Sequence, residues 1–127
     1  MRFLGIDYGD KRTGIAVSDD DGRIAFPRGV AEAGTDRRRI QAIKTAAKRE
    51  YAQAVILGLP VEESGKEGPS AQKVRAFGKK LERALSLPIF FQNELLTTRI
   101  ASVKPSGEKG IDAQAAAIIL QSYLDNR

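Results

Sequence analysis

Residues 3–22, FLGIDYGDKRTGIAVSDDDG, decide which fold the rest of the chain can complete. The apolar run at residues 2–7 is short and flanked by glycine, which indicates a buried strand. Residues 13–19 alternate larger apolar side chains with smaller ones, as a half-buried strand does. The first strand ends in a carboxylate, Asp7, which is followed by Tyr-Gly. A carboxylate beside a buried strand is costly unless it is paired or binds a metal, so Asp7 is a candidate for function.

A third strand is predicted to follow directly. Asp21 and Gly22 form a two-residue hairpin signal, after which residues 23–32 can return along the second strand. Pro27 lies within this returning segment and cannot donate a hydrogen bond to a neighbouring strand. We therefore expect Pro27 on a sheet edge or at a bulge, and the chain should begin with antiparallel hairpins.

Helices and apolar strands alternate in the rest of the chain, which adds parallel strands through helical crossovers. This order predicts an α/β fold with a mixed sheet and flanking helices, in one domain that covers residues 1–127. Buried strands are expected at residues 54–60 and 87–91, a short helix at residues 93–103, and loops at residues 61–68 and 104–110. Three longer helices are expected, which begin after Thr35, at Pro69 and at Asp112. Each has a stripe of residues that should face the core. The stripes are Ile40, Ile43, Ala47 and Tyr51 in the first helix, Val74, Phe77, Leu81 and Leu85 in the second, and Ala116, Leu120 and Leu124 in the third.

The composition restricts the chemistry that the chain can perform. Its 127 residues include no cysteine and no histidine, which excludes disulfides, thiolate nucleophiles and zinc sites built from these side chains. The net charge of +5 favours an anionic partner. The sequence has neither a signal peptide nor an apolar run long enough to cross a bilayer. We therefore expect a soluble, cytoplasmic protein with no membrane partner.

Carboxylates stand at three places where a sheet could bring them together. Asp7 ends the first strand, and Glu94 follows the strand at residues 87–91 in the same way. Ligands bind at the carboxyl ends of the strands in open α/β sheets. Asp112 precedes the last helix. Each also has a simpler explanation, since Asp7 can close an Asx turn, Glu94 can favour a helix N-terminus and Asp112 can cap a helix.

Carboxylates without histidine or cysteine suit a hard cation. Mg²⁺ binds a few carboxylates together with water and substrate phosphate oxygens. Two such ions about 3.5–4 Å apart could activate a water molecule and stabilise the leaving oxygen in phosphodiester cleavage. Taken together, Asp7, Glu94 and Asp112 therefore suit a site for a hard cation such as Mg²⁺ or Mn²⁺.

Four blocks of the sequence also resemble a known family. The blocks IDYGDKRTGIAVSD, ILGLPVEESGKEG, LPIFFQNELLTT and IDAQAAAIILQSYLD are similar to those of the YqgF/RuvX family, RNase H-like nucleases related to the RuvC Holliday junction resolvase. The resemblance runs essentially end to end. It implies an RNase H-like fold, and it implies the roles of metal ligand and catalytic residue for Asp7, Glu94 and Asp112.

The same resemblance implies a substrate and partners. It implies a nuclease that matures the 5′ end of precursor 16S rRNA or, alternatively, one that resolves Holliday junctions. The expected partners are precursor rRNA or branched DNA, and ribosomal particles, with the chain acting as a monomer or weak homodimer.

One block departs from the family pattern. The usual Asp-Glu-Arg-Leu-Thr reads Asn-Glu-Leu-Leu-Thr here, so Asn93 lacks a charge and Leu95 lacks a cation. A non-catalytic RNA-binding module of the same fold therefore stays open as an alternative. A sugar-kinase or actin-like phosphate-binding domain is a further one, because DYGDKRTG resembles the first phosphate loop of those proteins.

Cations close in sequence to the carboxylates are candidates for binding nucleic acid. Tyr8 is the one aromatic residue expected to stack on a base. The run Arg37, Arg38 and Arg39 opens a helix, where it could contact nucleic acid but is better explained as a solvated face. The predicted phosphate contacts are Lys11, Arg12, Arg99, Lys104 and Lys109.

Overall fold

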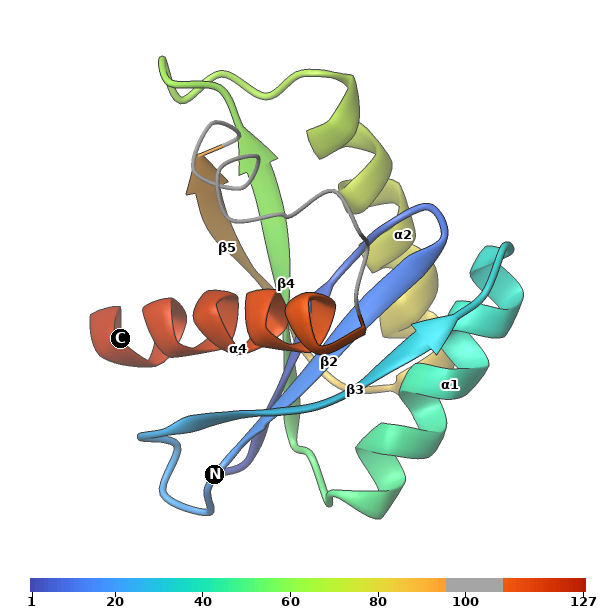
Figure 1. Cartoon of the computed structure of the whole chain (residues 1–127), viewed down its shortest axis with the longest axis vertical. Coiled ribbons are helices and arrows are strands. Elements are labelled where there is room, and N and C mark those ends of the chain that lie inside the picture. The colour runs from blue at the N-terminus through green and yellow to red at the C-terminus, as the bar shows by residue number, and fades with distance from the viewer. Residues whose placement is uncertain (96–108) are drawn as a thin grey trace.

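A computed structural model describes residues 1–95 and 109–127, and these form a mixed sheet with helices on both faces (Figure 1). No helix among these residues is long and apolar enough to pass through a bilayer. Along the chain the elements are β1 (Phe3–Asp7), β2 (Arg12–Ser18), β3 (Ala25–Glu32), α1 (Asp36–Arg49), β4 (Ala54–Val61), α2 (Pro69–Leu85), β5 (Ile89–Leu95) and α4 (Lys109–Asn126).

The sheet has the order β3-β2-β1-β4-β5 and confirms the predicted mixture of strand directions. Strands β1, β2 and β3 pair antiparallel, whereas β4 pairs parallel with both β1 and β5. Pro27 lies on the edge strand β3, opposite a register shift between Ile15 and Ala16 of β2. The prediction that Pro27 lies on a sheet edge or at a bulge is therefore confirmed. Gly22 takes a positive φ of +67° in the turn between β2 and β3, which only glycine adopts without strain.

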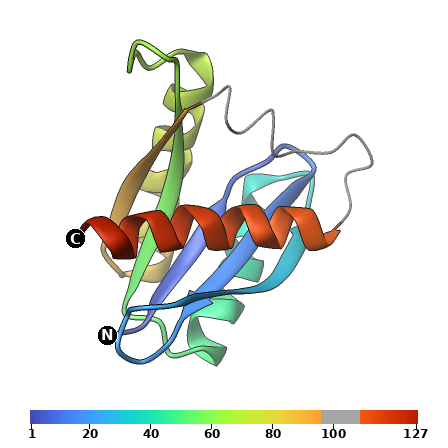
Figure 2. The same cartoon turned by 60° about the vertical axis from the view of Figure 1, so that its left-hand side comes forward.

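Helices cover the two faces of the sheet unequally. Among the described residues, helices α1 and α2 pack on one face, while α4 crosses the strands on the other (Figures 1 and 2). Every residue of β4 is buried because the strand is central and covered from both sides. The predicted inward stripes of α2 and α4 are confirmed as buried or half-buried residues. Tyr51 is the exception, because α1 ends at Arg49 and leaves this side chain 80% exposed.

Element boundaries differ from the sequence prediction at two places near the carboxylates. Strand β5 continues to Leu95, so the helix predicted for residues 93–103 does not begin at residue 93. Residues 96–103 of that predicted helix lie outside the described part of the chain, and so do residues 104–108 of the loop predicted to follow it. Helix α4 begins at Lys109, which places Asp112 in its first turn and not at its cap. The cap predicted for α1 is confirmed, since Thr35 Oγ1 accepts a hydrogen bond from the Arg38 amide at 3.3 Å.

Candidate active site

Two of the predicted carboxylates lie at one edge of the sheet. Strands β1, β4 and β5 run parallel and end toward the same side of the molecule (Figure 1). Asp7 is the last residue of β1 and is 6% exposed, and Glu94 is paired in register with Pro60 near the end of β5. Two residues before Glu94, the Gln92 amide donates a hydrogen bond to Ser122 of α4 at 3.2 Å. Because side chains alternate along a strand, Glu94 also belongs to the α4 face.

Helix α4 brings the third carboxylate to this edge. Gly14 of β2 is the register partner of Asp7, and a Cβ atom at Gly14 would lie 2.0 Å from the carbonyl oxygen of Asp112. The first turn of α4 therefore rests directly on the strand beside Asp7. Only glycine permits this approach, because any side chain would occupy the space of the helix backbone.

A second glycine separates Asp7 from Glu94. Leu57 of β4 pairs with Ile6 of β1, so the next residue of β4, Gly58, lies beside the end of β1. A Cβ atom at Gly58 would lie 2.6 Å from Ile119 Cδ1 and 3.4 Å from Glu94 Oε2. At Gly58, between the two carboxylates, β4 thus presents no side chain toward α4.

We expect that Gly14→Ala will disturb both the fold and the site. The added methyl group must push α4 away from β2, and overpacking of this kind costs about 1–3 kcal/mol of the free energy of unfolding. Gly29→Ala, on the edge strand β3, is the matched control because a Cβ atom there meets nothing within 4 Å. Thermal unfolding of the two variants checks this. Equal stability of Gly14→Ala and wild type would contradict the close contact with Asp112.

One oxygen of each carboxylate at this edge is shielded from water. Asp7 Oδ1, Glu94 Oε2 and Asp112 Oδ2 are each buried, and Asp112 Oδ2 has no hydrogen-bond partner among the described residues. Buried carboxylate oxygens fit a hard cation such as Mg²⁺. Within residues 1–95 and 109–127, however, no group of three acidic side chains is gathered closely enough to hold a metal ion. The carboxylates share an edge and a face of the sheet, but they do not enclose an ion by themselves.

The departure at Asn93 does not fall on this face. Phe91 packs against α2, since a Cβ atom at Gly78 would lie 2.9 Å from its ring. Asn93 is two residues further along β5, so it belongs to the α2 face, where it is exposed. The missing charge at residue 93 therefore removes no carboxylate from the side on which Glu94 lies.

A buried arginine holds the turn that follows Asp7. The Arg39 side chain of α1 is 3% exposed; its Nε donates to the Gly9 carbonyl at 3.1 Å, and its Nη2 donates to the Asp10 carbonyl. Its Nη1 donates to Asp36 Oδ1 at 2.7 Å. The sequence prediction that Arg37, Arg38 and Arg39 form a solvated face was therefore wrong for Arg39, because these acceptors hold its guanidinium group inside the protein. The prediction was right for Arg37 and Arg38, which are exposed.

Tyr8 belongs to the same network and is not available to stack on a base. Its ring is 7% exposed and packs against Phe77 with ring centroids 4.6 Å apart, while the Arg39 guanidinium lies 4.9 Å from its centre. The sequence prediction for Tyr8 was wrong, because the turn directs the ring into the core. Its hydroxyl group donates to Asp36 Oδ1 at 3.1 Å.

The pKa values in this network follow from burial and hydrogen bonding. Burial raises the pKa of Tyr8, and its hydrogen bond to Asp36 raises it further. Burial acts to raise the pKa of Asp36, but hydrogen bonds from Lys80, Tyr8 and Arg39 outweigh it and hold that pKa below its usual value. Asp36 therefore stays ionised and keeps Arg39 paired.

The predicted phosphate contacts can be placed only in part. Lys11 is exposed beside the turn, and Arg12 lies 3.8 Å from Glu32 in an ion pair. Lys109 begins α4, but its side chain lies outside the described part of the chain, as do the residues Arg99 and Lys104.

Lys73 is a cation near the turn that the sequence did not reveal. It pairs with Asp10 at 2.5 Å and lowers the pKa of that carboxyl group through their hydrogen bond. Both residues line a pocket of about 290 Å³ with Tyr8 and Ser70. No sequence signal links Lys73 to Asp10, because α2 reaches this turn only through tertiary packing. The pair of Arg39 and Asp36 could have been found from the sequence, because the two residues have the i,i+3 spacing of a helix pair.

Comparisons with known proteins show which sequences this chain resembles. Residues 1–126 match the family described as "RuvX: Holliday junction resolvase". A protein of Nitratidesulfovibrio vulgaris (strain Miyazaki F) named "Putative pre-16S rRNA nuclease" is 38% identical, over 98% of this chain and 94% of its own. A protein of the same name from Caldanaerobacter subterraneus subsp. tengcongensis is 39% identical, over 100% of this chain and 98% of its own.

Solved structures share the fold at low sequence identity. Thermus thermophilus RuvC in complex with a Holliday junction substrate superposes with a TM-score of 0.61 at 18% identity, covering 100% of this chain and 96% of that one. The fowlpox virus Holliday junction resolvase gives a TM-score of 0.56 at 18% identity, with both chains fully covered. The sheet and its helices therefore have the RNase H-like arrangement of RuvC-type resolvases.

Proposed function

Because this chain belongs to the RuvX family, a family of nucleases, we propose that it is a metal-dependent nuclease that matures the 5′ end of precursor 16S rRNA. The observation that carries the proposal is the contact of Gly14 with Asp112, which sets the first turn of α4 beside Asp7. Glu94 lies on the same face of the same sheet edge. The name shared by the curated relatives supports precursor rRNA as the substrate, and we place the activity in the cytoplasm.

In this proposal Asp7, Glu94 and Asp112 hold Mg²⁺ or Mn²⁺ with their carboxylate oxygens. The bound ion would activate a water molecule and stabilise the leaving oxygen during hydrolysis of the phosphodiester bond. The chain's own contribution is to keep these oxygens at one edge and to shield them from bulk water. Since no group of three acidic side chains is preassembled in the described residues, substrate phosphate oxygens would complete the coordination.

Activity should depend on added metal at millimolar concentration. Affinity for Mg²⁺ without substrate is expected to be weak, because much of its octahedral shell falls to water and phosphate. Cleavage should stop with EDTA and return with excess Mg²⁺, or with a lower concentration of Mn²⁺. Cleavage of labelled precursor rRNA across a metal titration checks this. Undiminished cleavage in excess EDTA would exclude the mechanism.

Lys11 should contribute to affinity more than to chemistry. It is exposed two residues beyond Gly9, on the turn that follows Asp7, and no ion pair engages it among the described residues. Lys11→Ala should weaken RNA binding for unrelated sequences and lower the salt slope by about one unit. Lys79→Ala serves as a control, because Lys79 is exposed on α2 away from this edge of the sheet. Equal affinities and slopes for Lys11→Ala and wild type would place the substrate on another face.

Four-way junction DNA is the second candidate substrate, because the matching family is described as a Holliday junction resolvase. Single-turnover cleavage of a precursor 16S rRNA fragment and of a four-way junction, under the same metal conditions, tests the two directly. We expect cleavage of the rRNA at its 5′ precursor boundary and little cleavage of the junction. Cleavage of the junction alone would reverse the assignment, and cleavage of neither would favour a non-catalytic RNA-binding module.

A further inference from the structure

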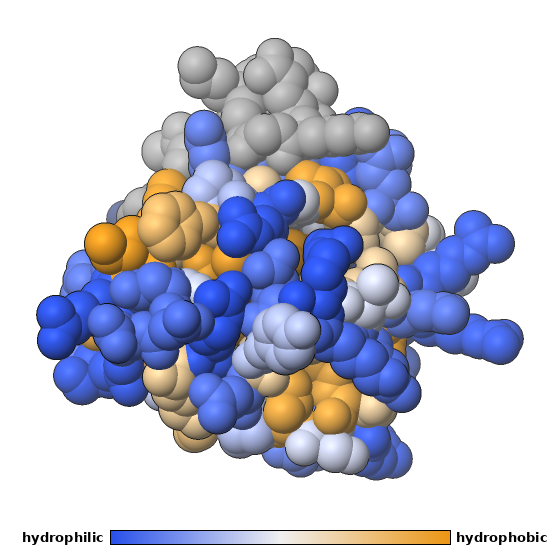
Figure 3. Space-filling view, turned by 90° about the horizontal axis from the view of Figure 1, so that it is seen from below, coloured by the Kyte–Doolittle hydropathy of each residue, from blue (hydrophilic) through white to orange (hydrophobic). Residues whose placement is uncertain are grey.

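A second pocket lies at the end of the sheet opposite to the carboxylates. It has a volume of about 720 Å³ and lies where α1 and α2 end and β4 begins. This end of the molecule is at the bottom of Figure 1 and faces the viewer in Figure 3, where small apolar areas are set in a mostly hydrophilic surface. Nothing in the proposed cleavage site accounts for this pocket.

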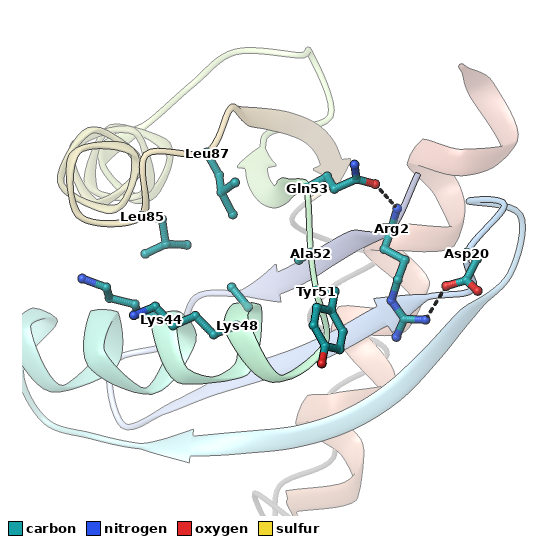
Figure 4. Close-up of a pocket in the computed structure, with 10 residues that line it drawn as sticks. Arg2, Asp20, Lys44, Lys48, Tyr51, Ala52, Gln53, Leu85 and Leu87 are labelled. Atoms are coloured by element: carbon teal, nitrogen blue, oxygen red, sulfur yellow. Dashed lines mark hydrogen bonds and ion pairs between the residues drawn. The ribbon is translucent and has the colours of Figure 1, made fainter.

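The pocket combines an apolar wall with cations. Figure 4 shows Leu85 and Leu87 on one side and Lys44 and Lys48 of α1 on another. Both leucines are half-buried and both lysines are exposed. Neither lysine forms an ion pair among the described residues, although the two like charges are one helical turn apart. Lys48 can offset the dipole at the end of α1, but Lys44 lies a turn too early to do so.

The other charges at the pocket are already matched. Arg2 pairs with Asp20 at 2.8 Å (Figure 4) and also with Glu50 at 3.2 Å. The carboxylate of Asp20 is therefore engaged and does not neutralise the lysines. The pocket thus offers two uncommitted positive charges to a ligand.

Tyr51 stands at this pocket in a backbone conformation that favours glycine. Its φ is +56°, and its amide donates to the Lys48 carbonyl at 3.3 Å, while the Ala52 amide donates to the Ala47 carbonyl at 2.9 Å. These bonds are those of a Schellman motif, in which the left-handed residue is usually glycine. The chain places there an aromatic ring that is 80% exposed, so burial does not explain the residue.

An exposed aromatic ring flanked by uncommitted cations is how proteins bind single-stranded nucleic acid, since bases stack on the ring and phosphates contact the cations. We infer that the pocket formed by Lys44, Lys48, Tyr51, Leu85 and Leu87 binds a nucleotide of single-stranded RNA, away from the cleavage site. The inference rests on the proposed function in taking RNA as the ligand. An RNA held at both places would run along the length of the sheet.

Binding without turnover tests this inference. The parent is full-length Asp7→Asn, and the probe is a labelled single-stranded oligoadenylate followed by fluorescence anisotropy. Tyr51→Gly should weaken binding about tenfold through loss of stacking, while its thermal midpoint rises because glycine suits the left-handed position. Tyr51→Phe should retain the affinity of the parent. A variant that is both more stable and a weaker binder cannot be explained by unfolding.

The lysines give a second readout. Lys44→Ala and Lys48→Ala should each lower the salt slope by about one unit, and Lys79→Ala, an exposed lysine of α2 outside this pocket, should not. Unchanged affinity in Tyr51→Gly would overturn the inference, as would binding of an acidic peptide at this pocket in place of RNA. Because cleavage is not measured, failure here leaves the Asp7-dependent nuclease standing. Failure of the nuclease likewise leaves this binding test intact.

Discussion

Replacing Asp7 by Asn should reduce cleavage of precursor rRNA about a thousandfold or more, a loss at the upper end of those seen when one electrostatic group is removed from an active site. The amide keeps the shape of the side chain at the end of β1 but supplies no negative charge for a divalent cation. Asp7 is buried and shares its edge with Glu94 and Asp112. Removal of one like charge should therefore leave the thermal midpoint unchanged or slightly higher.

The combination of the two readouts makes this prediction specific. Single-turnover cleavage measures the chemical step, and thermal unfolding of the same preparation shows that the fold persists. Asp21→Asn, in the turn between β2 and β3, is the matched control and should cleave as wild type does. Retention of the wild-type cleavage rate by Asp7→Asn would show that the site has been placed wrongly.

Arg39→Ala should cost about 3 kcal/mol of the free energy of unfolding, at the lower end expected for loss of one partner of a buried ion pair, because Arg39 is buried but Asp36 is partly exposed. For a domain of this size that lowers the thermal midpoint by about 10 °C. The loss is large because one guanidinium group binds Asp36 and the carbonyls of Gly9 and Asp10. Calorimetry or thermal unfolding followed by circular dichroism measures the change.

Arg39 should also affect cleavage, as a positioning residue for the turn after Asp7. Arg39→Lys keeps the charge but cannot reach three acceptors with one ammonium group, so we expect partial recovery of stability and a raised requirement for Mg²⁺. Arg38→Ala is the matched control, because Arg38 is exposed one residue earlier on the same helix. If Arg38→Ala and Arg39→Ala were equally stable, the buried network would not hold the turn.

Most of the secondary structure could be predicted from the sequence because its signals are local. The alternation in residues 13–19, the cap at Thr35 and the stripe of α2 each depend on neighbours within a few residues. Pro27 was placed correctly for the same reason, since its missing donor restricts it wherever it occurs. Tyr51 was misplaced because a helical spacing continues past the point where the helix itself ends at Arg49.

The candidate site was less predictable because its parts meet only in the folded chain. The sequence pointed to Asp7, Glu94 and Asp112 as an expected group, and the structure places them at one edge and face without closing them around an ion. The sequence did not indicate that the backbone of Asp112 packs directly against Gly14, because the two residues are almost a hundred positions apart. The sequence also could not show which of the three adjacent arginines is buried. Arg39 is buried because its guanidinium group donates to the carbonyls of Gly9 and Asp10, which lie in the turn after β1.

The position of the bound metal ion would show whether these three carboxylates form the site. Crystals of the protein grown with Mn²⁺ and an RNA that resists cleavage would show the ion through its anomalous scattering. We predict a peak at the carboxyl edge of the sheet, about 2 Å from oxygens of Asp7, Glu94 and Asp112. A peak coordinated by other side chains, with none of these carboxylates within reach of the ion, would show that Asp7, Glu94 and Asp112 are not the metal ligands.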